Sequence, residues 1–413
     1  MTLIFFVYLL KEGFEYLLRY LNFRHMKKFG LSVPSVLEGK IDVDLLKKTQ
    51  AYETEKTRFS FISSLFGNIV TIIFIFGGLL NIYNSWVVSL QMPFIVSGLL
   101  FFLILSYANT VISIPFSLYS TFKIENKYGF NTMTPKLWLK DFFKSIILST
   151  IITGILVSVG LWIVQLSPNA WWIWIWGFFL VFSLFMMYIS PYVIEPLFNK
   201  FTPLEEQVLA EQIKHMLHKV SITVSRVFRM DASKRSRHTN AYFSGIGRVK
   251  RIILYDTLLE IMNHDEILAV LAHEAGHWKR KHILKMIIAT ELLSFFILYG
   301  VFRIFQTDLL TDLFYVQNGT FFAKIVIIGF LGGIVSLLFI PFSSSISRRF
   351  EREADRFAFS LSGNNESMIS ALIKLSKDNL SNLHPHPLYA AFYYSHPPMV
   401  QRIEQIRNLT RDE

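Results

Sequence analysis

The 413-residue chain contains no cysteine. It can therefore form no disulfide bond and no thiolate metal site, and any zinc ion must be held by histidine and carboxylate side chains. Residues 2–21 also lack the basic start and the small-residue cleavage site of a secretory signal peptide. We find no internal repeat and no low-complexity tract. These absences exclude a disulfide framework and leave the redox compartment open.

Hydrophobic residues make up 52% of the chain and aromatic residues 16%, and the mean hydropathy is positive. A soluble protein of this size is less apolar, so the composition indicates an integral membrane protein. A helix needs about 20 residues to cross a hydrocarbon core about 30 Å thick. Six apolar stretches are long enough: residues 60–84, 92–117, 145–166, 170–195, 283–306 and 322–346. A seventh span at residues 2–21 is interrupted by Lys11, Glu12, Glu15 and Arg19, and the alternative there is an amphipathic helix at the membrane surface.

The formal net charge of +11 is concentrated on one side of the predicted spans. Segments 22–59 and 118–144 are rich in lysine and arginine, whereas the loops 85–91, 167–169 and 307–321 contain neither. Basic loops mark the cytoplasmic side, so we expect segment 196–282 and the tail after residue 347 in the cytoplasm. The N-terminus then lies outside if the first span is real. Because the basic residues serve to orient the spans in the membrane, we expect a lipid bilayer as partner and no nucleic acid.

The segment His273-Glu274-Ala275-Gly276-His277 carries the most specific chemical signal in the chain. On a helix the two histidines stand one turn apart on one face, so both imidazoles can reach one zinc ion. Glu274 lies beside them, where it can take a proton from a water that the metal acidifies. Residues 263–282 are expected to be helical, with Asn263 as N-cap. The alternative, a chance match on a surface helix, is disfavoured by this context.

A catalytic zinc site usually has three protein ligands, so one more is expected downstream. Segment 348–358 is expected to be helical and carries Glu351, Glu353 and Asp355. Glu351 and Asp355 share a helix face, whereas Glu353 lies about 200° around the helix from Glu351 and should point away. We assign Glu351 as the third ligand, and Asp355 as the partner of the outer nitrogen of a ligand histidine. The alternative is a solvated charged face.

A small β element is expected between the fifth span and the zinc helix. Its strands are Val224–Met230, Asn240–Gly245 and Val249–Tyr255, with Gly245 and Gly247 as turn residues. An exposed edge strand there can bind an extended peptide through its backbone. Asn240 would lie on that edge, although an asparagine in such a position is commonly a turn or cap residue.

Together these residues resemble the CAAX prenyl protease 1 family, integral-membrane zinc metalloproteases of the gluzincin group. The resemblance covers nearly the whole chain. It rests on Phe14–Leu17 with Arg24, Tyr52–Phe59, Tyr119–Glu125 with Gly129–Asn131, Glu195–Phe201, Asn240–Tyr242, His273–His277, Glu351–Asp355, and Ser395–Pro398 with Arg402. It implies a helical barrel of seven membrane spans around a hydrated chamber, with the zinc site in its wall near the cytoplasmic side.

The same resemblance implies roles for three residues that are ambiguous without it. Asn240 matches the family residue that holds substrate backbone, His396 the one that steadies the tetrahedral oxyanion, and Arg402 an arginine that braces the acidic side of the site. Without the resemblance, His396 is not distinguishable from His384 and His386 in the same Pro-rich loop. The lack of cysteine fits a prokaryotic member in a bacterial cytoplasmic membrane, and the chain shows no ER-retrieval tail.

We therefore predict an α-helical integral membrane protein with a cytoplasmic gluzincin-type protease domain, divided as 1–195, 196–282, 283–346 and 347–413. One Zn²⁺ would be held by His273, His277 and Glu351. The leading hypothesis is an endopeptidase acting on membrane or misfolded polypeptides; an alternative is removal of the C-terminal tripeptide of prenylated proteins, so the substrate is a polypeptide or a lipidated peptide. A non-enzymatic chaperone or transporter with structural zinc is disfavoured, because such a site usually has four protein ligands and no use for Glu274.

Overall fold

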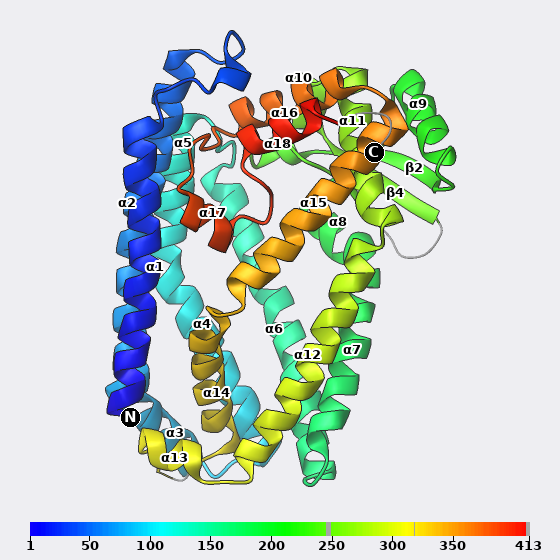
Figure 1. The fold of residues 1–413 in the computed structure, drawn as a ribbon. Coiled ribbons are helices and arrows are strands. Elements are labelled where there is room, and N and C mark those ends of the chain that lie inside the picture. Colours follow the sequence, from blue (N-terminus) through cyan, green and yellow to red (C-terminus); the bar gives the residue numbers. More distant parts are fainter. Residues whose placement is uncertain (245–248, 318, 410–413) are drawn as a thin grey trace.

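The computed structural model describes residues 1–244, 249–317 and 319–409. Figure 1 shows long helices running along the molecule, with a small sheet and further helices gathered at one end. The long helices are α1 (Thr2–Phe29), α2 (Val43–Thr71), α4 (Phe94–Tyr119), α6 (Pro135–Leu166), α7 (Trp171–Ile189), α12 (His282–Phe305), α14 (Phe321–Ser336) and α15 (Ile340–Ser362). Shorter helices near their ends are α3 (Leu79–Ser89), α5 (Asn126–Tyr128), α8 (Glu195–Phe198) and α13 (Leu309–Phe314).

Among the described residues, five helices are long and apolar enough to cross a membrane, or six if α14 and α15 form one bent span. They are Val43–Phe76, Phe94–Tyr128, Pro135–Leu166, Trp171–Phe198 and His282–Phe305, three of which include a short π-helical segment. The predicted spans 92–117, 145–166, 170–195 and 283–306 each overlap one of these helices.

Two predicted spans are not single straight helices. The helix that contains the span predicted at 60–84 begins at Val43 and breaks at Gly77 and Gly78, before the predicted end, where Gly78 has a φ of 81°. The span predicted at 322–346 breaks after Ser336, and α15 leaves α14 at an angle of 61°. Pro341 lies in the first turn of α15, where its missing N–H is tolerated, so the chain restarts as a new helix there. The sequence is apolar on both sides of each break, so hydropathy alone does not reveal that the helix ends there.

Helix α1 lies beside α2 (Figure 1), and its charged side chains face polar ones of α2. Asn68 donates to Glu12 at 2.8 Å, and Arg19 donates to Ser64 at 2.6 Å. Charges inside a membrane are tolerated when they are paired toward a neighbouring helix. Helix α1 is not among the five helices apolar enough to count as candidate spans, so the first span at residues 2–21 stays a prediction.

The apolar helices pack sparsely against one another. At most 17% of the residues in the apolar stretch of any of the five helices are buried. A solid bundle buries one face of each helix, so such sparse packing is characteristic of helices arranged around an open interior.

The other end of the molecule holds the sheet, with strands in the order β1-β2-β4-β3. The strands are β1 (Phe201–Pro203), β2 (Thr223–Met230), β3 (Ala241–Ser244) and β4 (Val249–Tyr255). β2 and β4 are parallel and the other pairs antiparallel, which leaves β3 on an edge. The three predicted strands are present and β1 was not predicted. The predicted turn residues Gly245 and Gly247 lie outside the described residues.

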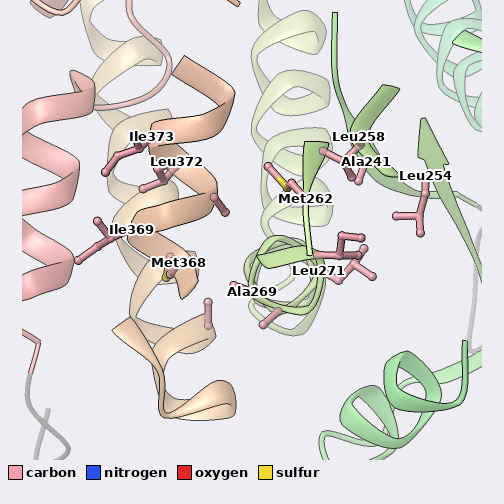
Figure 2. Packing of buried hydrophobic residues seen from close by; sticks show 14 of the residues in the cluster. Ala241, Leu254, Leu258, Met262, Ala269, Leu271, Met368, Ile369, Leu372 and Ile373 are labelled. Carbon is pink, nitrogen blue, oxygen red and sulfur yellow. The ribbon is translucent and has the colours of Figure 1, made fainter. Parts of the chain in front are cut away.

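Helices around this sheet form the largest hydrophobic core. They are α9 (Gln207–His218), α10 (Asp256–Ile261), α11 (His264–Lys279), α16 (Asn365–Asp378) and α18 (Met399–Arg407). Helix α17 (Pro387–Tyr393) lies outside this core, against α15 and α1. Figure 2 shows Leu271 of α11 near Leu254 of β4, with Ile369 and Leu372 of α16 in the same cluster. Burying each such side chain contributes about 1.5–3 kcal/mol to folding. The core thus fixes α11 between the sheet and α16.

Two local features set the position of α11. Asn263 and Glu266 form a capping box, as the predicted N-cap requires, and Glu266 also accepts from Lys374 of α16 at 2.7 Å. On the opposite side α11 crosses α15 closely, because a Cβ on Gly276 would lie 2.9 Å from Ala354 Cα. Only glycine permits this approach without displacing backbone.

Candidate metal centre and active site

Helices α11 and α15 bring three predicted ligands together. His273 and His277 stand one turn apart on α11, and their Nε2 atoms are 3.2 Å from each other. The carboxylate of Glu351 on α15 reaches both, with Oε2 lying 3.3 Å from His273 Nε2 and Oε1 lying 3.2 Å from His277 Nε2. The three side chains form a candidate metal site.

The donor set fits a zinc ion. Zinc bonds to nitrogen and oxygen are about 2.0–2.2 Å long, so two ligands of a tetrahedral ion lie about 3.3–3.6 Å apart. The two Nε2 atoms are 3.2 Å apart, and each lies 3.2 or 3.3 Å from one of the two Glu351 oxygens, distances close to that edge length. Glu351 Oε2 is buried and has no hydrogen-bond partner among the described residues. A buried carboxylate oxygen without a partner is unusual unless an ion binds it.

Residues of α15 and α18 hold the outer nitrogen of His273. Asp355 Oδ1 lies 2.7 Å from His273 Nδ1, so Nε2 is the nitrogen left for a metal. Arg402 of α18 donates its Nε and Nη2 to Asp355 at 2.7 and 2.6 Å. Only 11% of the Arg402 side chain is exposed. Arg402 therefore contacts the acidic side of the site and has little surface to offer a substrate.

The outer nitrogen of His277 has a partner that was not predicted. His282, the first residue of α12, places its Nδ1 3.0 Å from His277 Nδ1 and its Nε2 3.1 Å from Glu353 Oε2. The ring of His282 also stacks on Phe350 at 4.1 Å. As predicted, Glu353 is absent from the ligand cluster, but it reaches the cluster indirectly through His282. No sequence pattern signals this contact, because it depends on how α12 meets α15.

Models of two protein families match this chain. The family described as CAAX prenyl protease N-terminal, five membrane helices, matches residues 22–200, and peptidase family M48 matches residues 203–410. A CAAX prenyl protease 1 homolog of Arabidopsis thaliana is 36% identical over 403 residues, covering 94% of this chain and 93% of that protein. The CAAX prenyl protease 1 of Saccharomyces cerevisiae is 34% identical, covering 93% and 90%.

The chain belongs to the CAAX prenyl protease 1 family within peptidase family M48. The crystal structure of S. mikatae Ste24p agrees, with a TM-score of 0.89, 32% identity and coverage of 97% of this chain and 98% of that one. Membership confirms the predicted resemblance and the fold class, a helical membrane protein with a small sheet. The protein is accordingly a membrane metalloendopeptidase.

Two more residues of this M48 site lie beside the ligands. Glu274 follows His273 on α11, and burial raises the pKa of its carboxyl above the ordinary value. His396 lies in the loop between α17 and α18, with its Nε2 3.3 Å from Glu351 Oε1 and its Nδ1 2.9 Å from Ser395 Oγ. Its side chain is 61% exposed, so it remains accessible to a bound molecule.

The other two histidines of the Pro-rich loop serve as structural contacts. His384 Nε2 lies 2.8 Å from the Ser32 carbonyl, and the Nδ1 of His386 accepts the Leu388 N–H at the start of α17. Of the three, only His396 contacts a candidate ligand, as the family resemblance implied.

Asn240 lies just before edge strand β3, and its side chain is exposed. Its Oδ1 accepts the N–H of Ala241 at 2.8 Å, which is a local turn contact of the kind that asparagine commonly makes. Its own carbonyl accepts the Tyr255 N–H at 3.2 Å. The structure places Asn240 at the predicted edge but not among the contacts of the metal site.

Proposed function

We propose that this protein is a zinc endopeptidase whose metal is held by His273, His277 and Glu351. The supporting observation is the gathering of both histidine Nε2 atoms, 3.2 Å apart, around the Glu351 carboxylate, whose two oxygens lie 3.2 and 3.3 Å from them. One of these oxygens, Oε2, has no hydrogen-bond partner among the described residues. Three protein ligands are the number found in catalytic sites with an open position. When bound there, zinc would polarise the scissile carbonyl and acidify water.

The remaining side chains have separable roles in this proposal. Glu274 accepts a proton from the attacking water and returns it to the leaving amine, and its raised pKa suits both steps. Exposed His396 stabilises the negative oxygen that develops on the substrate. Asp355 fixes the tautomer of His273, and Arg402 holds Asp355 in place. Asn240 and the free edge of β3 would hold the backbone of an extended substrate.

We further propose that the metal site lies on the cytoplasmic side. The loops on that side are basic, and those at the far ends of the helices contain no lysine or arginine. A bacterial source and the division of the chain at residues 195, 282 and 346 remain predictions.

Two classes of substrate are candidates for this protease. A bound backbone along an edge strand requires no particular sequence, which favours a general endopeptidase for membrane or misfolded polypeptides. Removal of the C-terminal tripeptide from prenylated proteins is favoured by the relatives. These are named CAAX prenyl protease 1 or its homolog, and their similarity covers more than 90% of this chain.

Zinc content and cleavage of a quenched fluorescent peptide by the detergent-purified protein test the proposal. We expect about one zinc per chain, activity that a chelator abolishes and zinc restores, and no activity in Glu274→Gln despite retained zinc. Normal cleavage by Glu274→Gln would exclude the role given to Glu274. Zinc without cleavage of any peptide would favour the non-enzymatic alternative. A farnesylated peptide and its unprenylated twin separate the two substrates, since only CAAX processing requires the lipid.

A further inference from the structure

A strongly basic cavity lies where the membrane helices meet the sheet. Its volume is about 550 Å³, and its lining comes from α6, α8, the segment that leads into β1, β2 with the segment after it, and β4. In Figure 1, α7 and α8 lead up to the strands β2 and β4 at this junction. Six basic side chains line the cavity: Lys140, Lys144, Lys200, Lys234, Arg235 and Arg251. Among the described residues that line it, Asp231 alone is acidic.

Most of this positive charge is not neutralised. Asp141 lies 2.8 Å from Arg235 and 3.8 Å from Lys144, so it offsets part of their charge. Asp231 accepts a backbone N–H at 2.6 Å. Within the described part of the chain, no ion pair involves the three remaining lysines, Lys140, Lys200 and Lys234. Lysines gathered around one concave surface without acidic partners favour binding of an anion.

Arg251 is held in the lining without a carboxylate. Its guanidinium carbon lies 5.2 Å from the ring centre of Tyr192 and 4.6 Å from that of Phe228, and one N–H reaches the Pro191 carbonyl at 3.3 Å. Aromatic rings orient an arginine and leave its charge unpaired. The remaining N–H groups of this planar group suit a phosphate, which arginine binds in a fork.

The cavity lies at the ends of two apolar helical stretches. Lys144 immediately precedes the apolar run 145–166, and Leu197 follows the apolar helix α7. Large apolar side chains beside these residues are exposed, with 55% of Phe143, 60% of Ile147 and 44% of Leu197 accessible. Cations above an exposed apolar surface match a molecule with an anionic head and a hydrocarbon body.

We propose that this cavity binds the phosphate headgroup of an anionic phospholipid, whose acyl chains extend over the apolar surface of α6 and α8. Basic pockets between membrane helices are the sites that bind such headgroups. The site is separate from the metal centre, and the proposal does not depend on the peptidase activity. Free phosphate offers the same anionic group, but it has nothing to place on the apolar surface.

A second basic cavity provides a matched control. It has a volume of about 820 Å³ and is lined by Lys27, Lys47, Arg58 and Lys127 together with Glu55. Here Lys127 lies 2.7 Å from Glu55, and Lys47 lies 2.9 Å from Asp44. The lysines of this second cavity belong to the same basic side of the molecule as those of the first, but Lys47 and Lys127 have acidic partners. The control separates a specific site from general attraction of basic residues to an anionic surface.

The experiment is lipid titration of the detergent-purified full chain, with bound lipids counted by native mass spectrometry. The probes are phosphatidylglycerol, zwitterionic phosphatidylcholine, and inorganic phosphate as competitor. The double variant Lys200→Gln/Lys234→Gln should bind phosphatidylglycerol about 30-fold more weakly, since each lysine at an anionic surface contributes about fivefold. The control Lys27→Gln/Lys47→Gln should stay within about twofold. The variant Lys200→Arg/Lys234→Arg keeps both charges and should retain binding, which excludes a folding defect as the cause.

Loss of phosphatidylglycerol binding confined to the first double variant supports the proposal. Equal weakening in both glutamine variants would show general electrostatic attraction and overturn it. Equal affinity for phosphatidylcholine would overturn it as well. If inorganic phosphate displaces the lipid at equal concentration, the site recognises a free anion, and the lipid assignment is wrong.

Discussion

Glu353 offers a direct test of how the surroundings of His277 affect metal binding. For His277 to present Nε2 to a metal, its proton must be on Nδ1, from which it donates to His282 Nδ1 at 3.0 Å. His282 must then carry its own proton on Nε2 and donate it to Glu353 at 3.1 Å. The carboxylate thus fixes both tautomers at once. Glu353→Gln removes its charge and leaves a neutral oxygen as the acceptor.

The expected magnitude follows from the hydrogen bond that each substitution weakens or removes. Removing the partner behind a metal-ligating histidine costs about 10–100-fold in metal affinity. Glu353→Gln keeps a weaker acceptor, so we expect about a tenfold loss, the lower end of that range. His282→Phe retains an aromatic ring to stack on Phe350 but leaves His277 Nδ1 facing an apolar side chain at the buried position 282, with no acceptor, so about a hundredfold loss is expected.

Competition between the purified protein and a chromophoric chelator measures these zinc affinities. The matched control is Glu366→Gln, which makes the same chemical change at an exposed position on α16, and should bind zinc within about twofold of the unmodified chain. Thermal unfolding of the zinc-free proteins serves as the structural control. Affinities of Glu353→Gln and His282→Phe indistinguishable from the control would refute the reasoning. Equal losses of affinity and of zinc-free stability would show that these residues act through the fold.

Three further substitutions test other parts of the structure. Gly276→Ala places a Cβ 2.9 Å from the backbone of α15, and this overpacking should destabilise the protein by about 1–3 kcal/mol, measured as a lower melting temperature. Asp355→Asn should lower zinc affinity about tenfold or more while leaving the zinc-free protein folded, because His273 Nδ1 loses its charged acceptor. Burial works to raise the pKa of Glu266, but hydrogen bonds, the largest of them from Lys374, bring the net pKa below its ordinary value. A lowered folded-state pKa gives stability above the unfolded pKa that is lost as pH falls through the folded pKa, so the melting difference between the unmodified chain and Glu266→Gln should shrink in acid. A difference that does not change with pH would contradict the assigned shift.

Most of the apolar helices could be predicted from the sequence in approximate place, but their breaks could not. Six spans and an uncertain seventh were predicted, whereas five helices of the described chain, or six with the bent pair, are long and apolar enough. Apolar length predicts a span because a helix must match the thickness of the bilayer. It says nothing about backbone torsion angles, so the breaks at Gly78 and before Pro341 were missed. Apolar length also does not show how the charged residues of α1 are accommodated: Glu12 and Arg19 have polar partners in Asn68 and Ser64 of α2.

The metal site, too, could be predicted from the sequence only in part. His273, His277 and Glu351 were predictable because helical spacing alone places two histidines, and then two carboxylates, on shared faces. Asp355 followed from the same rule. His282 was not predictable, because the left-handed backbone at Lys281 separates α11 from α12 and ends the helical periodicity that linked it to His277.

Helix α15 shows how three carboxylates with different directions can serve one site. Glu351 points at the candidate metal, and Asp355, one turn on, faces His273. Glu353 lies on another side of α15, and that side faces the first turn of α12. Since α12 is long and apolar enough to cross a membrane, His282 connects the candidate metal site directly to one of the candidate membrane helices. A displacement of α12 relative to α15 must therefore change a hydrogen bond to His277, so the geometry at the metal depends on the packing of the membrane helices as well as on the sheet and its core.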